Sequence, residues 1–202
     1  MLTRFTLQHP TYFLSLLLRT FQNLNSRLIN SIMPATISTC FTFESGYNTE
    51  TRDIPELRFI EAYAAKVDSL NLSDNFDVWY GTLAIFENAD GVIYNGGQQI
   101  WQWMHAIFAP FSAMKHIVHK VRFIKDGVLD EGVLIEMECT TQFWPKSLLK
   151  PASIDVRRFL SFVVAKAEPG KGTYGYWIVH AMAWWDTAVL ARGLKNEGSN
   201  MP

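Results

Sequence analysis

The spacing of apolar residues in this 202-residue chain changes at Pro110, and that change constrains the fold more than any other feature. Before Pro110 the apolar residues recur every three or four positions, which is typical of helices. After Pro110 they alternate with polar residues, which is typical of half-buried strands. Four long strands are predicted there, over residues 113–124, 133–144, 157–168 and 174–185. Helices followed by long consecutive strands predict an α+β fold, in which the helices cover one face of a curved antiparallel sheet.

Three helices are predicted in the part of the chain that precedes these strands. The first spans residues 55–70, begins with a proline at a helix-start position and has one apolar stripe. The second is shorter and lies within residues 73–86, after an aspartate that serves as a candidate cap. The third, over residues 98–111, has the most regular apolar face. A short strand within residues 91–97 precedes the third helix.

The chain is expected to form one domain, residues 54–191, between an N-terminal extension of residues 1–53 and a polar tail of residues 192–202. The start of the extension contains no Asp or Glu and carries arginines beside an apolar helical stripe, as mitochondrial transit peptides do. Two other interpretations are a loosely docked helix and a segment upstream of a true start at Met33. The expected location is the cytoplasm, or the mitochondrion if residues 1–32 are a transit peptide.

The charge balance, the short apolar runs and the cysteine content limit the partners and the compartment that are expected for this chain. The 18 basic and 19 acidic side chains give a net charge of −1, with no basic patch for nucleic acid or an anionic membrane. The longest apolar run near the N-terminus is far shorter than the roughly 20 residues that span a bilayer, so no membrane span is expected. The two cysteines, Cys40 and Cys139, do not make a disulfide framework, which favours a reducing compartment.

No metal and no cofactor are expected. The histidines have no second ligand at metal-site spacing, and no cysteine or carboxylate cluster accompanies them. The sequence GKGTYG at residues 170–175 matches the dinucleotide-binding fingerprint letter for letter. It connects two predicted strands instead of opening a helix, so it is interpreted as a turn.

The first long strand contains two histidines, His116 and His119, which must face opposite sides of a regular sheet. A hairpin with the next strand brings opposite charges together in two pairs, Arg122 with Glu136 and Lys120 with Glu138. In this register His119 lies on the apolar face and His116 on the polar face. A β-bulge near Val118 would exchange the two faces. The direction of these two side chains decides which of them is a candidate acid–base group.

The order of the predicted elements and the closing stretch YWIVHAMAWW, residues 176–185, resemble the nuclear-transport-factor-2-like superfamily over about residues 54–190. That superfamily includes SnoaL-type polyketide cyclases, ketosteroid isomerase and scytalone dehydratase, alongside pocket proteins without catalysis. The resemblance implies a cone-shaped fold, in which a curved sheet wraps over the helices and leaves an apolar pocket at the open end. It also implies a homodimer or another homo-oligomer, commonly formed through the outer face of the sheet.

The scytalone dehydratase branch of that superfamily is similar at individual positions. Its essential aspartate after the first helix corresponds to Asp68, and its essential histidine after the third helix corresponds to His116. A pocket tyrosine corresponds to Tyr94, whereas Val67 stands where that branch has a second tyrosine. The resemblance therefore implies that His116 is a general base, that Asp68 orients it and that Tyr94 polarises the substrate oxygen. His119 is the alternative base.

The resemblance also implies an aromatic-rich pocket for a flat, mostly apolar small molecule. The residues expected to line it are Phe76, Trp79, Tyr80, Trp103, Met104, His180 and Trp184. Ordinary core packing is the alternative interpretation, and it is the more common role for such a set of residues. The expected function is a cofactor-independent lyase, isomerase or cyclase that transfers protons on a polyketide-like or terpenoid-like molecule, in secondary-metabolite biosynthesis. The alternatives are a non-catalytic small-molecule-binding or dimerisation module and a scaffold that binds a partner through the exposed sheet face.

Overall fold

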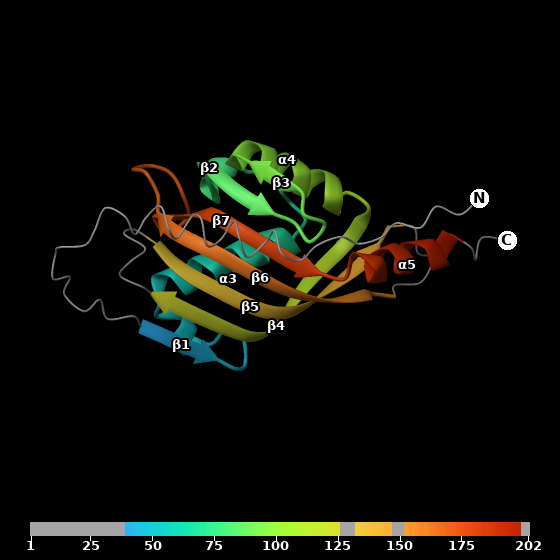
Figure 1. Cartoon of the computed structure of the whole chain (residues 1–202), viewed down its shortest axis with the longest axis horizontal. Helices are drawn as coiled ribbons and strands as arrows, with labels where there is room; N and C mark the ends of the chain where they lie inside the picture. Colours follow the sequence, from blue (N-terminus) through green and yellow to red (C-terminus); the bar gives the residue numbers. More distant parts are fainter. Residues whose placement is uncertain (1–38, 126–131, 147–151, 199–202) are drawn as a thin grey trace, which may run out of the picture. The chain divides into compact units, whose positions relative to one another are not determined.

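The computed structural model describes residues 39–125, 132–146 and 152–198, so the candidate transit segment and Met33 lie outside the described residues. Within them, seven strands form one curved sheet that does not close, in the order β1-β4-β5-β6-β7-β2-β3 (Figure 1). The strands are β1 (Thr39–Phe43), β2 (Tyr80–Glu87), β3 (Ile93–Asn95), β4 (Phe111–Lys125), β5 (Gly132–Pro145), β6 (Ile154–Lys166) and β7 (Tyr176–Trp185). The helices are α2 (Thr49–Arg52), α3 (Pro55–Asp68), the 3₁₀ helix η1 (Phe76–Val78), α4 (Gly97–Phe108) and α5 (Thr187–Gly198).

The sheet and its helices confirm the predicted α+β class. Figure 1 shows α3 lying behind the curved layer of β4, β5 and β6. The four predicted long strands are present as β4 to β7, and each is antiparallel to the next. The pair formed by β2 and β7 is parallel, so the sheet is mixed at that edge. The predicted first and third helices are present as α3 and α4.

Helix α3 places Asp68 close to the inner face of the sheet. The helix begins at Pro55, whose fixed φ suits the first helical position, and it ends at Asp68. Leu57 and Ile60 on its inner stripe are completely inaccessible to solvent. Burial of each of these side chains stabilises the fold by about 1.5–3 kcal/mol. Leu70 then adopts a positive φ of 54°, which turns the chain just after Asp68.

The predicted second helix is wrong. Only η1 is helical in that stretch, and Tyr80–Glu87 form strand β2. Ala84 and Phe86 are buried whereas Leu83 and Ile85 are exposed, so burial follows a period of two residues instead of 3.6. Strand pairing with β3 and β7 overrides the helical spacing that the same residues also satisfy.

Strands β4 and β5 are joined in the predicted register at two pairs, Arg122–Glu136 and Lys120–Glu138. The register then shifts by one residue between Val118 and Lys120, because His119 is the extra residue of a β-bulge. Beyond the bulge His116 pairs with Thr141. The regular alternation that places His119 on the apolar face is therefore wrong: His119 is exposed and the His116 side chain is turned inward.

Two segments outside residues 54–191 contribute to the folded unit. Strand β1 pairs with β4, although its residues fall in the expected N-terminal extension. Helix α5 covers most of the expected polar tail, with Leu190 buried. Gly193 packs so closely on β6 that a Cβ atom there would lie 2.6 Å from the Ile154 side chain. Most of the polar tail therefore belongs to a helix that packs on the sheet, which its composition alone does not reveal.

Candidate functional site

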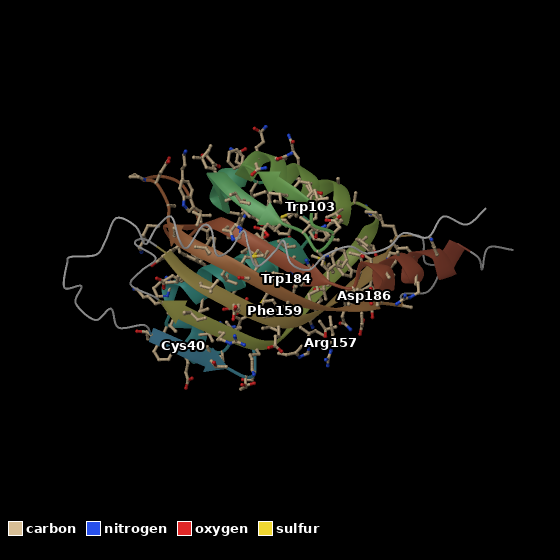
Figure 2. All side chains as sticks on the ribbon, in the orientation of Figure 1. Cys40, Trp103, Arg157, Phe159, Trp184 and Asp186 are labelled. Atoms are coloured by element: carbon tan, nitrogen blue, oxygen red, sulfur yellow. The ribbon has the colours of Figure 1, made fainter. Side chains whose placement is uncertain are left out.

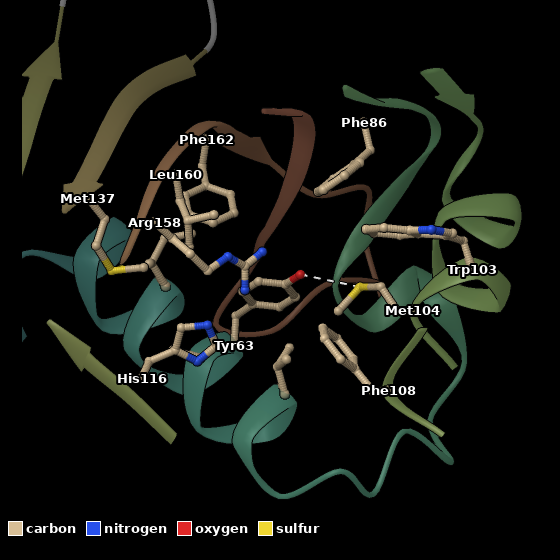
Figure 3. Close-up of a pocket in the computed structure, with 13 residues that line it drawn as sticks. Tyr63, Phe86, Trp103, Met104, Phe108, His116, Met137, Arg158, Leu160 and Phe162 are labelled. Atoms are coloured by element: carbon tan, nitrogen blue, oxygen red, sulfur yellow. Dashed lines mark hydrogen bonds between the residues drawn. The ribbon is translucent and has the colours of Figure 1, made fainter. Parts of the chain in front are cut away.

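A mainly apolar cavity lies between α3, α4 and the inner face of the sheet (Figure 3). Its walls include Ile60, Phe86, Trp103, Met104, Phe108 and Phe162. Its volume is about 40 Å³, taken over the positions open to the centre of a water molecule, which corresponds to roughly three waters. A larger ligand requires methionine side chains in the wall to change rotamer, which unbranched thioethers do readily. Three side chains with polar groups also face this space: Tyr63, His116 and Arg158.

His116 and Asp68 form a hydrogen-bonded pair at the wall of the cavity. Nδ1 of His116 lies 2.6 Å from Oδ1 of Asp68. The backbone N–H of His116 also donates to both carboxylate oxygens, at 3.1 and 3.0 Å. Because a carboxylate only accepts, Nδ1 carries the proton of the neutral imidazole and Nε2 keeps a lone pair. The His116 side chain is 6% exposed and the Asp68 side chain 24%, so the imidazole is largely shielded from water whereas the carboxylate is partly exposed.

The environment of His116 keeps its imidazole neutral. Burial lowers the pKa of His116 below its usual value of 6.5, and the charge of Arg158 lowers the pKa further. The hydrogen bond that His116 donates to Asp68 and the charge of the Asp68 carboxylate oppose this shift without cancelling it. At pH 7 His116 is therefore in the form that accepts a proton, next to a carboxylate that stabilises the cation once it forms.

Arg158 brings a positive charge to the cavity. It lies on β6 in phase with the buried Val156 and Leu160 and turns inward, whereas the adjacent Arg157 is exposed on the outer face (Figure 2). No hydrogen bond or ion pair of the Arg158 guanidinium is present among the described residues, and its Nε is buried without a partner. The guanidinium carbon lies 5.3 Å from the centre of the Trp185 ring. Burial lowers the pKa of Arg158, but an arginine stays protonated in proteins.

Two buried tyrosines place a hydroxyl group in the cavity. The hydroxyl oxygens of Tyr63 and Tyr80 lie 2.5 Å apart, and the Met104 sulfur lies 3.5 Å from the first and 3.6 Å from the second. Burial raises the pKa of Tyr63 to about 12 and the pKa of Tyr80 well above its usual value, so both are protonated at neutral pH. When Tyr80 donates to Tyr63, the Tyr63 proton faces only a thioether, which is a weak acceptor. Tyr63 lines the cavity and can therefore donate to a ligand oxygen.

The structure brings some of the predicted site residues together. His116, Trp103 and Met104 line the cavity, and Asp68 is bonded to His116 at its edge. Tyr94 is not a lining residue, and its ring stacks on Trp103 with ring centres 4.8 Å apart. Tyr63, which lines the cavity, is therefore better placed than Tyr94 to polarise a substrate oxygen.

The other predicted aromatic residues lie near the cavity but not in its wall. Tyr80 is fully buried and reaches the site through its contacts with Tyr63 and Met104. Trp79 packs in the core against Phe59, with ring centres 6.1 Å apart. Phe76 borders a separate, open and more polar groove beside α4.

The remaining predicted histidines and tryptophan lie away from the cavity. His119 is exposed, and its Nε2 lies 2.8 Å from the Thr140 hydroxyl. His180 Nε2 lies 3.1 Å from a carboxylate oxygen of Glu87. Trp184 is 44% exposed on the outer face of the sheet (Figure 2).

Two residues of the site, Tyr63 and Arg158, are not predicted as site residues from the sequence. The signal for Arg158 is present in the sequence, because it occupies the inward phase of a strand otherwise filled by Val156, Leu160 and Phe162. Tyr63 gives no comparable signal, since an aromatic residue beside the apolar stripe of a helix is ordinary core composition.

No group of three or more His, Cys, Asp or Glu side chains is placed to bind a metal ion within residues 39–125, 132–146 and 152–198. None of the helices in these ranges is long and apolar enough to cross a membrane.

The fold and the site define a pocket-bearing α+β domain, and comparison with solved structures identifies its fold. Nuclear transport factor 2 from Cryptosporidium parvum superposes with a TM-score of 0.51 at 12% identity, over 69% of this chain and 97% of that one. A protein provisionally named scytalone dehydratase from Novosphingobium aromaticivorans gives 0.53 at 12% identity, over 69% and 89%. One provisionally named SnoaL-like polyketide cyclase, from Shewanella putrefaciens, gives 0.50 at 12% identity, over 69% and 96%.

This chain therefore has the nuclear-transport-factor-2-like fold, as its sequence resemblance implies. No protein-family model matches the sequence, and no curated protein matches it either. Because the structural similarity comes with so little sequence identity, it defines the fold and leaves the function to the residues of the site.

Proposed function

We propose that this protein is an acid–base enzyme of the lyase, isomerase or cyclase type that acts on a mostly apolar, polyketide-like or terpenoid-like small molecule. The observation that carries the proposal is the 2.6 Å contact between His116 Nδ1 and Asp68 Oδ1 at the wall of an apolar cavity. An imidazole held in this way presents Nε2 as a base of fixed direction. The names of the polyketide cyclase and scytalone dehydratase structures are consistent with such chemistry on this fold.

The site residues account for each proton in such a reaction. Nε2 of His116 removes a proton from a carbon next to a carbonyl group, and the electron pair moves onto the carbonyl oxygen. The Tyr63 hydroxyl donates to that oxygen as its negative charge develops. Asp68 stabilises the imidazolium, which then returns the proton. Return of the proton to a leaving hydroxyl group releases water, whereas return to a different carbon gives an isomer.

Proton abstraction can be tested without knowledge of the natural substrate. The probes are 2-tetralone and the smaller cyclohexanone in D₂O, and NMR follows exchange of the protons next to the carbonyl. We expect the protein to accelerate exchange of at least one ketone above the buffer rate. His116→Asn is expected to lower that rate about 100-fold or more. His119→Asn, a change three residues away on the outer face, is the matched control and is expected to leave the rate unchanged. Equal rates for these two variants would rule out His116 as the base.

A non-catalytic binding module is the second candidate function, and the lining of the cavity favours it. Most of the walls are apolar side chains, which hold a ligand without taking part in chemistry. If this candidate is correct, the ketones bind without any acceleration of exchange. Calorimetry of binding together with the exchange measurement therefore separates the two functions.

A further inference from the structure

We infer that the ligand of this cavity is an organic acid, an apolar body with one carboxylate group, and that Arg158 binds that carboxylate. The inference rests on the proposed function in that it assigns the ligand to the same cavity. It adds the chemical class of the ligand, which neither His116 nor Asp68 specifies. It also gives a role to a buried cation that the proton transfer does not use.

The position of Arg158 is fixed by the middle of the sheet. On β6 its backbone lies opposite Cys139 of β5 and Trp185 of β7. Figure 3 shows the guanidinium group reaching into the centre of the cavity, beside Tyr63 and on the same side as His116. Arg158 also borders a second, smaller apolar hollow toward α5, lined by Leu190 among others. The cation therefore lies where two apolar spaces meet, instead of at the protein surface.

The described residues leave this cation without a counterion. Asp68 is the acidic side chain of the site, but His116 already engages its carboxylate. Both oxygens accept from the backbone N–H of His116, and one of them also accepts from the imidazole. Burial raises the pKa of the Cys139 thiol, so the thiol is neutral and does not balance the charge. The guanidinium instead lies over the face of the Trp185 ring, which carries no formal charge. A buried charge in this state favours an anion from outside the chain.

The chemistry of the guanidinium and the walls selects a carboxylate. Arginine presents parallel N–H donors in a planar fork that matches the two oxygens of a carboxylate. A phosphate would bring more charge and more acceptor oxygens than one arginine and one tyrosine hydroxyl can satisfy. The surrounding Leu160, Phe162 and Phe108 suit an aliphatic or aromatic body. A carboxylate at this point would also offset the positive charge that lowers the pKa of His116, and so would make His116 a stronger base.

The inference is tested by equilibrium binding, measured by calorimetry with matched probes. The probes are cinnamate with cinnamamide, 1-naphthoate with 1-naphthamide and octanoate with octanamide, in which each pair shares one apolar body and the charged carboxylate is replaced by a neutral amide. We expect at least one carboxylate to bind the wild-type protein about tenfold or more tightly than its amide. Arg158→Met, which keeps an unbranched apolar stem and removes the charged guanidinium group, is expected to abolish that preference. Arg157→Met, a change of the adjacent and outward-facing arginine, is expected to retain it.

Two results would overturn the inference. One is that no carboxylate binds the wild-type protein more tightly than its amide, and this comparison decides the matter even if Arg158→Met fails to fold. The other is that the folded Arg158→Met variant keeps the preference. His116→Asn separates this inference from the proposed catalysis: it is expected to keep the carboxylate preference. A carboxylate preference without any proton exchange would support the ligand class and would refute the proposed enzyme.

Discussion

The carboxylate of Asp68 holds His116 at two points, through the imidazole Nδ1 at 2.6 Å and through the backbone N–H at 3.0 and 3.1 Å. One contact fixes the direction of the ring, and the other ties the end of α3 to strand β4. The dyad is therefore part of the packing between a helix and the sheet as well as a chemical unit. Changes at Asp68 are expected to alter both the protonation of His116 and its position.

Asp68→Asn is expected to lower the pKa of His116 further. The hydrogen bond to Asp68 and its charge both raise that pKa, so their loss leaves burial and the charge of Arg158 less opposed. The exchange rate of a ketone probe should fall with it, because the imidazolium loses its stabilising carboxylate. NMR titration of the imidazole measures the shift. An unchanged or higher pKa in the variant would contradict the assigned pair.

The stability of the protein is expected to fall as the pH drops below about 6.5. The pKa of His116 in the folded state lies below its unfolded value, so the unfolded chain binds more protons in this window. The free energy of unfolding therefore decreases as the pH falls from about 6.5, the pKa of the unfolded state, toward the lower pKa of the folded state. Above about pH 6.5 the contribution of neutral His116 to stability is complete. Urea unfolding at pH 5.5 and 7.5 measures the difference. His116→Asn should reduce that difference and His119→Asn should not; an equal dependence in both variants would show that other groups cause it.

Arg158→Met is expected to leave the fold intact and to stabilise it or leave it unchanged. Among the described residues this buried charge has no hydrogen bond or ion pair, so its replacement by an apolar side chain removes a desolvation cost; comparable replacements of buried ion pairs stabilise by about 1–4 kcal/mol. Arg157→Met, at an exposed position, should lie within about 0.5 kcal/mol of the wild type. Urea unfolding compares the three proteins. A marked loss of stability in Arg158→Met alone would assign Arg158 a structural role.

Tyr63→Phe is expected to slow ketone exchange by about 10–100-fold, because it removes the hydroxyl group that faces the cavity. Tyr94→Phe is the matched control, since the Tyr94 ring stacks on Trp103 and does not line the cavity. Its rate should equal that of the wild type. The reverse order of effects would restore Tyr94 as the polarising group and exclude Tyr63.

Trp184→Glu is expected to convert a homodimer into monomers if the outer face of the sheet forms the interface. Trp184 is 44% exposed there and packs on Phe159, with ring centres 5.4 Å apart, so the pair offers an apolar contact surface. Val92→Glu, at a position with the same exposed fraction outside the strands, is the control. Light scattering after size-exclusion chromatography measures the mass of each. A monomeric wild type, or a dimeric Trp184→Glu, would contradict this interface.

The sequence predicts the long strands and two of the helices because the apolar residues of each fit either the strand period of two residues or the helix period of 3.6, but not both. The stretch around Tyr80 and Leu83 fits both periods, and its pairing with β3 and β7, which decides between them, is a tertiary contact. The direction of His116 depends on a single bulge, which residue patterns leave open. Arg158 could have been found from its phase in the strand, whereas Tyr63 could not.

The bulge at His119 also bears on how this chain is to be aligned with other proteins of its fold. His119 is an extra residue between Val118 and Lys120, so its deletion would leave a regular ladder with the same pairs on either side. A relative without the bulge would carry its inward histidine three positions before the equivalent of Lys120 instead of four. An ungapped alignment would then match that histidine to Ile117, and the inward histidine would be scored as missing.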